Sequence, residues 1–271
     1  MSDMPAIWKE ECSVQSFDVD MYGAMKPHSL LALLLNGCWN CTEGTFYGYR
    51  ELQARGQIWV MLKLQLQVDA LPRWRDRIVL ETWAKGVQKF YATRDFRISD
   101  LEGRRLVAAT SGWIILDRTS GRPYRFDQSR DGFPWLPTRH ELETSLEKVP
   151  ELTEYEEAAR YRVTYSDIDV NLHANATKYL QWMVDSNPRS VLETMRLKSA
   201  ELSFLAEAAL GDEVTVLAGR QPGNEGLFGI RRQGDQKDLA RGRITWESRA
   251  SGHRESREAQ GSQEATPSPS D

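Results

Sequence analysis

A short polar segment in the second half of the chain carries the side chains best suited to chemistry. Asp169, Asn171 and His173 alternate within it, directly before a stretch with the apolar spacing of a helix. A carboxylate, an amide and an imidazole at this spacing can be presented together beside the free N–H groups of a helix start. Asn171 and His173 could then stabilise an oxyanion, and Asp169 could orient one of them.

A fourth candidate, Glu207, follows the apolar residues Phe204 to Ala206, which are expected to end a strand. A carboxylate that is partly removed from water becomes a stronger base, so Glu207 could activate a water molecule. Taken alone, the Asn171–His173 pair would more often be a turn with a helix cap, and Glu207 an exposed turn residue. Their combination in one half of a repeated sequence favours a catalytic site.

The segment 165–180 resembles the Asp-x-Asn-x-His segment of plant and bacterial acyl-acyl carrier protein (ACP) thioesterases. In that family a helix with Lys-Tyr follows, here Lys178-Tyr179, and a catalytic Glu comes later at a strand end, here Glu207. The resemblance covers roughly residues 10–247. It implies hydrolysis of fatty acyl-ACP to a free fatty acid, with ACP as partner, with no cofactor or metal, and with the four side chains named above as catalytic residues.

One position departs from the plant pattern. Plant members carry a Cys after the catalytic Glu, whereas this chain has Ala208, so a thiol nucleophile at that position is excluded and attack by water remains.

The three cysteines, Cys12, Cys38 and Cys41, all lie in the first half. A small, odd number of cysteines suits a reducing cytoplasm. The Cys38–Cys41 spacing lacks a second pair or nearby histidines, so buried apolar packing is favoured over a zinc or redox site.

The elements that must position these side chains occur twice. Residues 58–68 alternate between apolar and polar, which is typical of a strand with one buried face, and Pro27 to Glu43 form an apolar helix that a curved sheet must wrap. In the second half a strand near 159–165 precedes a helix at 175–186. Further strand patterns lie at 77–83, 90–98, 107–117, 202–206, 214–218, 227–232 and 240–247. One helix cradled by an antiparallel sheet, present twice, predicts an α+β double hotdog fold with edge-to-edge pairing.

The predicted organisation has four parts. An N-terminal hotdog (1–126) is joined by a linker rich in Pro and charge (127–157) to a C-terminal hotdog (158–247). A polar tail (248–271) follows, too poor in apolar residues to order itself.

Aligning the two copies separates a catalytic copy from a binding copy. The junctions align with Asp20 to Met25 opposite Ile168 to His173, and Leu71 falls opposite Glu207. The first copy then lacks the catalytic side chains and is expected to supply the acyl slot. The candidate substrate-binding residues are Leu30, Leu34, Trp39 and Trp59.

The overall composition excludes several classes of function. The net charge of −4 argues against nucleic acid binding. No stretch approaches the ~18 apolar residues of a membrane span, and Met1 to Glu11 lack the pattern of a secretory signal. A cytoplasmic enzyme and possible homodimer is expected. The open alternatives are an acyl-CoA thioesterase, a hotdog dehydratase and a non-catalytic acyl-binding module.

Overall fold

The computed structural model describes residues 5–88, 90–126, 133–219 and 223–249. Within these residues ten strands form one antiparallel sheet in the order β1-β3-β4-β5-β2-β7-β10-β9-β8-β6. The first copy consists of β1 (Trp8–Ser13), α1 (Pro27–Thr42), α2 (Tyr49–Ala54), β2 (Gln57–Val68), β3 (Arg77–Gln88), β4 (Tyr91–Asp100) and β5 (Arg105–Asp117). The second consists of β6 (Glu156–Arg162), α3 (Ala176–Asp185), α4 (Arg189–Thr194), β7 (Met195–Phe204), β8 (Glu213–Gly219), β9 (Glu225–Arg232) and β10 (Asp238–Ser248).

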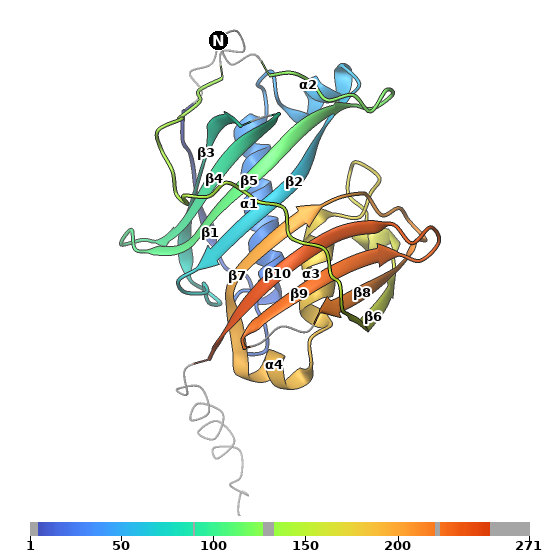
Figure 1. Cartoon of the computed structure of the whole chain (residues 1–271). Helices are drawn as coiled ribbons and strands as arrows, with labels where there is room; N and C mark the ends of the chain where they lie inside the picture. The colour runs from blue at the N-terminus through green and yellow to red at the C-terminus, as the bar shows by residue number, and fades with distance from the viewer. Residues whose placement is uncertain (1–4, 89, 127–132, 220–222, 250–271) are drawn as a thin grey trace, which may run out of the picture.

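The two copies join through a single pair of strands. β2 and β7 run antiparallel, with Lys63 opposite Ser203 and Gln67 opposite Ser199. This pairing covers what would be an exposed edge in each copy. Figure 1 shows the two sheets continuing into each other at this seam, with α1 and α3 behind them. The predicted double hotdog with edge-to-edge pairing is confirmed.

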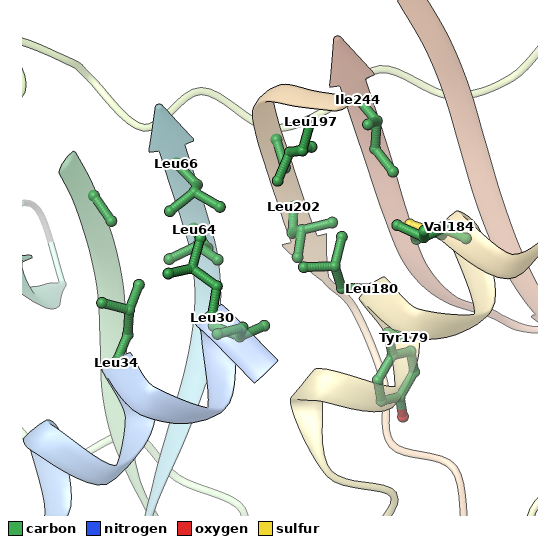
Figure 2. Packing of buried hydrophobic residues seen from close by; sticks show 14 of the residues in the cluster. Leu30, Leu34, Leu64, Leu66, Tyr179, Leu180, Val184, Leu197, Leu202 and Ile244 are labelled. Atoms are coloured by element: carbon green, nitrogen blue, oxygen red, sulfur yellow. The ribbon is translucent and has the colours of Figure 1, made fainter. Parts of the chain in front are cut away.

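The helices α1 and α3 lie side by side and share one hydrophobic core. Pro27 occupies the first turn of α1, where its missing N–H has no intrahelical partner to lose. Leu30 and Leu34 face Leu64 and Leu66 of β2 (Figure 2), and both α1 leucines are almost completely buried. The structure therefore confirms the predicted apolar helix wrapped by a sheet.

The side chains in the first part of β2 point to a different face of the sheet than predicted. A β-bulge between Met61 and Lys63 shifts the register against β5, so that the alternation reverses at this point. Leu64, Leu66 and Val68 point into the core as expected. Ahead of the bulge, Ile58, Val60 and Leu62 were expected on the same face. Instead, Val60 and Leu62 pack on the opposite face, against the cluster that contains Leu146.

The segment predicted as a linker is packed across the outer face of the sheet (Figure 1). In its described part, the Leu136 N–H donates to the Ala84 carbonyl (2.8 Å) and the Val149 N–H to the Ser203 hydroxyl (2.9 Å). The Glu141 N–H donates to the carboxylate of Asp95 (2.6 Å), which is fully buried and paired with Lys85 (3.0 Å). The segment thus crosses from one copy to the other while bonded to both.

Two strands are longer than predicted: β3 runs to Gln88 instead of residue 83, and β7 begins at Met195 instead of residue 202. β6 begins at Glu156, two residues before the predicted start of the second copy, and β10 ends at Ser248. Most of the predicted disordered tail lies outside the described residues. No helix of the described chain is long and apolar enough to cross a membrane.

Candidate active site

The connection between the first strand and the long helix is built alike in both copies. In the second copy the Asp169 N–H donates to the His173 carbonyl (2.9 Å), and the Asn171 N–H donates to Asp169 Oδ1 (2.8 Å). In the first copy the Asp20 N–H donates to the Ala24 carbonyl (2.8 Å), and the Tyr22 N–H to Asp20 Oδ1 (2.8 Å). The two turns therefore superpose bond by bond.

These bonds correct the alignment of the copies by one residue. Asp20 corresponds to Asp169 rather than to Ile168, so Tyr22 stands opposite Asn171 and Ala24 opposite His173. A short loop has no apolar period to set its register, and only the backbone bonds reveal it. The first copy still lacks the amide and the imidazole, but it does carry the aspartate.

Asp169 therefore has the same structural role as Asp20 of the first copy, which is to close the turn. Its Oδ1 closes the same turn as Asp20, so this bond does not depend on catalysis. No hydrogen bond joins its carboxylate to the His173 side chain among the described contacts, so the structure does not show the orienting role that was predicted. Burial is the largest influence on this group and raises the pKa of Asp169.

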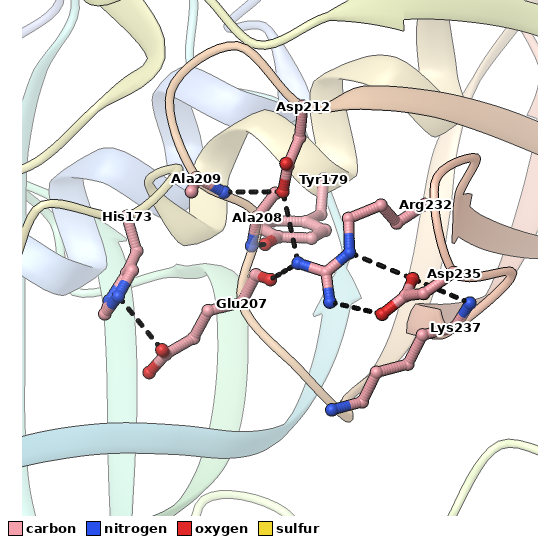
Figure 3. Close-up of polar contacts among 9 residues, drawn as sticks. All are labelled: His173, Tyr179, Glu207, Ala208, Ala209, Asp212, Arg232, Asp235 and Lys237. Atoms are coloured by element: carbon pink, nitrogen blue, oxygen red, sulfur yellow. Dashed lines mark hydrogen bonds and ion pairs between the residues drawn. The ribbon is translucent and has the colours of Figure 1, made fainter.

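His173 and Glu207 form a direct pair. Their Nε2 and Oε2 atoms are 3.0 Å apart (Figure 3), so the sequence-distant Glu207 is brought to the predicted imidazole. The predicted burial of Glu207 is not found, because its side chain is 49% exposed and that of His173 36%. Its direct contact with the imidazole, instead of removal from water, is what distinguishes this carboxylate from an ordinary surface glutamate.

Asn171 is oriented by a residue of the other copy. Arg118, just beyond β5, donates from Nη2 to Asn171 Oδ1 (3.2 Å). A guanidinium can only donate, so the amide oxygen must face Arg118, which leaves the Nδ2 group as a donor for a ligand. The sequence gave no signal for Arg118, because the two residues lie in different copies and 53 positions apart.

An apolar cavity of about 550 Å³ opens against this segment. Asp169 and Asn171 line it together with their neighbours in the turn and at the start of α3, whereas most of the other lining residues belong to the first copy. Trp39 and Trp59 are among the lining residues, as expected of the acyl slot. Leu30 and Leu34 are not, because they pack in the core with 0% and 1% exposure. Other lining side chains include Leu35, Cys38, Met61, Arg94, Trp113 and Trp135.

The His173–Glu207 pair is not part of the cavity lining. It is connected to the lining through the turn, because the His173 carbonyl accepts the Asp169 N–H. The four predicted catalytic residues are thus gathered at one place. Asp169 and Asn171 face the cavity, and His173 and Glu207 lie beside it, within reach of solvent.

The chemistry open to this site is narrow. In the described part of the chain no group of His, Cys, Asp and Glu could hold a metal ion. The three cysteines carry free thiols, and burial raises the pKa of Cys38, which lines the cavity, to about 12. A thiolate is therefore disfavoured there. The polar groups gathered at the site are an amide donor and an imidazole–carboxylate pair.

Comparisons with known proteins match most of the chain to one family. The family model of the acyl-ACP thioesterase N-terminal domain matches residues 5–129, and that of the C-terminal domain matches residues 151–248. A chloroplastic palmitoyl-ACP thioesterase of Cuphea hookeriana is 30% identical over 207 residues, which are 72% of this chain and 50% of that protein. A chloroplastic oleoyl-ACP thioesterase of Arabidopsis thaliana is 29% identical over 241 residues, 80% of this chain and 64% of that protein.

The fold has a counterpart among solved structures. The crystal structure of an acyl-ACP thioesterase from Bacteroides thetaiotaomicron superposes with a TM-score of 0.82 at 22% identity, covering 91% of this chain and 100% of that chain. At this identity the likeness shows the fold alone. The chain spans about half the length of the Cuphea protein and less than two thirds of the Arabidopsis protein.

The raised pKa of Asp169 gives a pH-dependent prediction. Because it lies above that of the unfolded chain, the folded protein binds an extra proton between the two values, and stability falls as the pH rises through that interval. Asp169→Asn keeps the oxygen that accepts the Asn171 N–H but removes the buried charge. We expect an equal or higher melting temperature at neutral pH, and a gain that disappears below about pH 4, where the unfolded carboxyl is protonated too.

Asp235→Asn is the matched control with the opposite sign. Hydrogen bonds from Arg232 lower the pKa of Asp235 to about 2. This change should therefore reduce the melting temperature at neutral pH, with the loss shrinking as the pH falls through the acid range. An Asp169→Asn protein that is less stable at neutral pH, or whose gain does not vary with pH, would contradict the account of Asp169.

Proposed function

The chain belongs to the acyl-ACP thioesterase family, and we propose that it hydrolyses fatty acyl-ACP to a free fatty acid and the thiol of the carrier. One observation carries the proposal above the others. An apolar cavity lined mostly by the first copy is also lined by Asn171 of the second, two residues from the His173–Glu207 pair. A fatty chain fits the cavity, and its thioester group would lie at the polar end.

Each polar group has a task in water attack on a thioester. The His173–Glu207 pair removes a proton from water as the water oxygen bonds to the carbonyl carbon. The Nδ2 group of Asn171, held by Arg118, donates to the oxygen that becomes negative. When the carbon–sulfur bond breaks, the pair returns the proton to the departing sulfur. Acid and thiol are then the products, and the protein is unchanged.

The imidazole and the carboxylate should act as one unit, because their Nε2 and Oε2 atoms are in direct contact at 3.0 Å. Glu207→Gln and His173→Gln are each expected to lower kcat about a hundredfold or more while the protein stays folded. The double variant should lose little beyond either single variant, as is usual for residues that act together. Glu213→Gln, an exposed glutamate at the start of β8, is the control and should keep full activity.

Steady-state kinetics and melting curves of these four variants and the wild-type protein test this prediction. If the two single losses multiply in the double variant, to about ten thousandfold, the residues act independently and the shared role is wrong.

The proposed acyl slot predicts a change in chain-length preference. Met61 lines the cavity, so Met61→Ala should lengthen it and shift kcat/KM toward longer acyl groups. Leu34→Ala removes a side chain of similar size from the core behind α1. That change should lower stability by about 2–5 kcal/mol and leave the preference where it was.

Hydrolysis of acyl-ACP substrates of increasing length by the three proteins gives the comparison. A uniform fall in activity for Met61→Ala, with the preference unmoved, would place the acyl chain elsewhere.

The function itself is tested by offering the same acyl groups on two carriers. We expect the wild-type protein to release free fatty acid from acyl-ACP, with a lower kcat/KM on the matching acyl-CoA. Equal or better hydrolysis of acyl-CoA would assign the chain to the acyl-CoA thioesterases. Binding of either substrate without release of a thiol would make it an acyl-binding module.

Two further parts of the proposal concern the cellular setting. The free thiols of all three cysteines support a reducing compartment such as the cytoplasm.

A homodimer is the assembly that we propose to test by light scattering of the whole chain, and the mass of a single chain would contradict it.

A further inference from the structure

A buried phenol of α3 accepts a backbone hydrogen bond next to Glu207. Tyr179 is 3% exposed, and its hydroxyl oxygen accepts the N–H of Ala208 at 2.9 Å (Figure 3). Ala208 itself is completely buried, so its N–H has no access to water. Burial raises the pKa of Tyr179 to about 12, which keeps the phenol neutral throughout the working range of the protein.

The other polar group of Ala208 is also bonded, and to the catalytic turn. Its carbonyl accepts the N–H of Ala174 at 2.8 Å. Ala208 directly follows Glu207, and Ala174 directly follows His173. The two hydrogen bonds of Ala208 therefore tie the residue after Glu207 to the helix and to the turn. Arg232 adds a third restraint, because its Nη1 donates to the Glu207 carbonyl at 3.2 Å.

The first copy shows what this site looks like without the phenol. Pro72 takes the place of Ala208, because its carbonyl accepts the N–H of Met25 (2.8 Å) as that of Ala208 accepts the N–H of Ala174. Leu30 takes the place of Tyr179. Lys26 and Asn175 are equivalent, because the Lys26 N–H donates to the Asp18 carbonyl (2.9 Å) as the Asn175 N–H donates to the Asp167 carbonyl (2.8 Å). Leu30 and Tyr179 each follow these residues by four positions and are therefore equivalent too.

The two differences belong together. Proline has no N–H, so the first copy has no donor at this position and needs no acceptor from its helix. The second copy has the donor and supplies the acceptor. The copy with the pair is also the one that carries Glu207 and His173, whereas the first copy has Leu71 and Ala24 there.

We infer that Tyr179 is a positioning residue, which holds Glu207 against His173 by binding the Ala208 N–H. This inference rests on the proposed function for its kinetic consequence. The hydrogen-bond pairing itself does not depend on that function. Tyr179 does not touch the substrate cavity among the described lining residues, so it acts on the reaction only through Glu207.

The decisive variants remove first the acceptor and then the donor of this hydrogen bond. Tyr179→Phe leaves the Ala208 N–H buried without an acceptor. It should lower the melting temperature by roughly 2–10 °C and kcat by roughly ten- to a hundredfold, with KM within about twofold of the wild-type value. Adding Ala208→Pro removes the unpaired donor. The double variant should regain most of the lost stability and most of kcat.

A matched control separates loss of this hydrogen bond from loss of any phenol. Tyr161 of β6 stacks on Trp182 of the same helix, and its hydroxyl does not bond to Ala208. Tyr161→Phe should keep kcat and the melting temperature close to the wild-type values.

A readout without substrate keeps this test separate from that of the function. The side-chain NMR signals of His173, identified through His173→Gln, report its bond to Glu207. They should shift in Tyr179→Phe and return in the double variant. If the wild-type protein hydrolyses no acyl thioester, the proposed function fails, and the NMR signals and melting temperatures still decide the inference. Wild-type kcat and unchanged His173 signals in Tyr179→Phe, or a double variant no better than the single one, would overturn it.

Discussion

The pairing of β2 with β7 is the interaction on which the site depends. A hotdog unit alone has a helix, a sheet and an open edge, and neither copy holds all the parts of this site. The short ladder from Lys63 to Gln67 brings the cavity of the first copy against the turn of the second. Arg118 can reach Asn171 only because the seam sets the two copies side by side. The packed segment between the copies is bonded on both sides of that seam.

The two copies share the order of their elements and the hydrogen bonds of the turn, but differ in the side chains that they carry there. Both copies form the same aspartate turn, and in both a carbonyl after the sheet strand receives the N–H that follows the turn. On this common frame the first copy carries Tyr22, Ala24 and Leu71, where the second carries Asn171, His173 and Glu207. A frame that forms without the polar residues can tolerate their exchange, which is consistent with the proposed roles of the second copy in chemistry and of the first in binding.

Both long helices and most of the strands were predictable because their apolar periods are strong, whereas the part of β7 before residue 202 was missed. The helix from Pro27 was placed within one residue of its observed end, and Glu207 was matched to Leu71 correctly. The facing of β2 ahead of Met61 was not predictable, because a bulge changes which side chains are inside without changing the pattern of residue types. The one-residue error between the turns has a similar origin, since a loop of six residues contains no period.

Contacts between distant residues were the other limit. Arg118 and the packed segment across the outer face become recognisable only once the seam has been formed, and no local pattern marks them. The exposure of Glu207 was missed because an apolar strand predicts burial of the strand and not of the residue that leaves it. The short helices α2 and α4 were also missed, since six residues give too few turns for a helical period.

The most direct test of this division of labour is a crystal structure of the chain with a non-hydrolysable acyl-pantetheine analogue, in which a ketone replaces the thioester. The account predicts that the acyl chain lies in the first-copy cavity between α1 and Trp59, with the carbonyl oxygen bonded to Asn171 Nδ2. It also predicts that the carbonyl carbon faces a water bound to the His173–Glu207 pair. An acyl chain lodged within the second copy, or a carbonyl group turned away from Asn171, would contradict it.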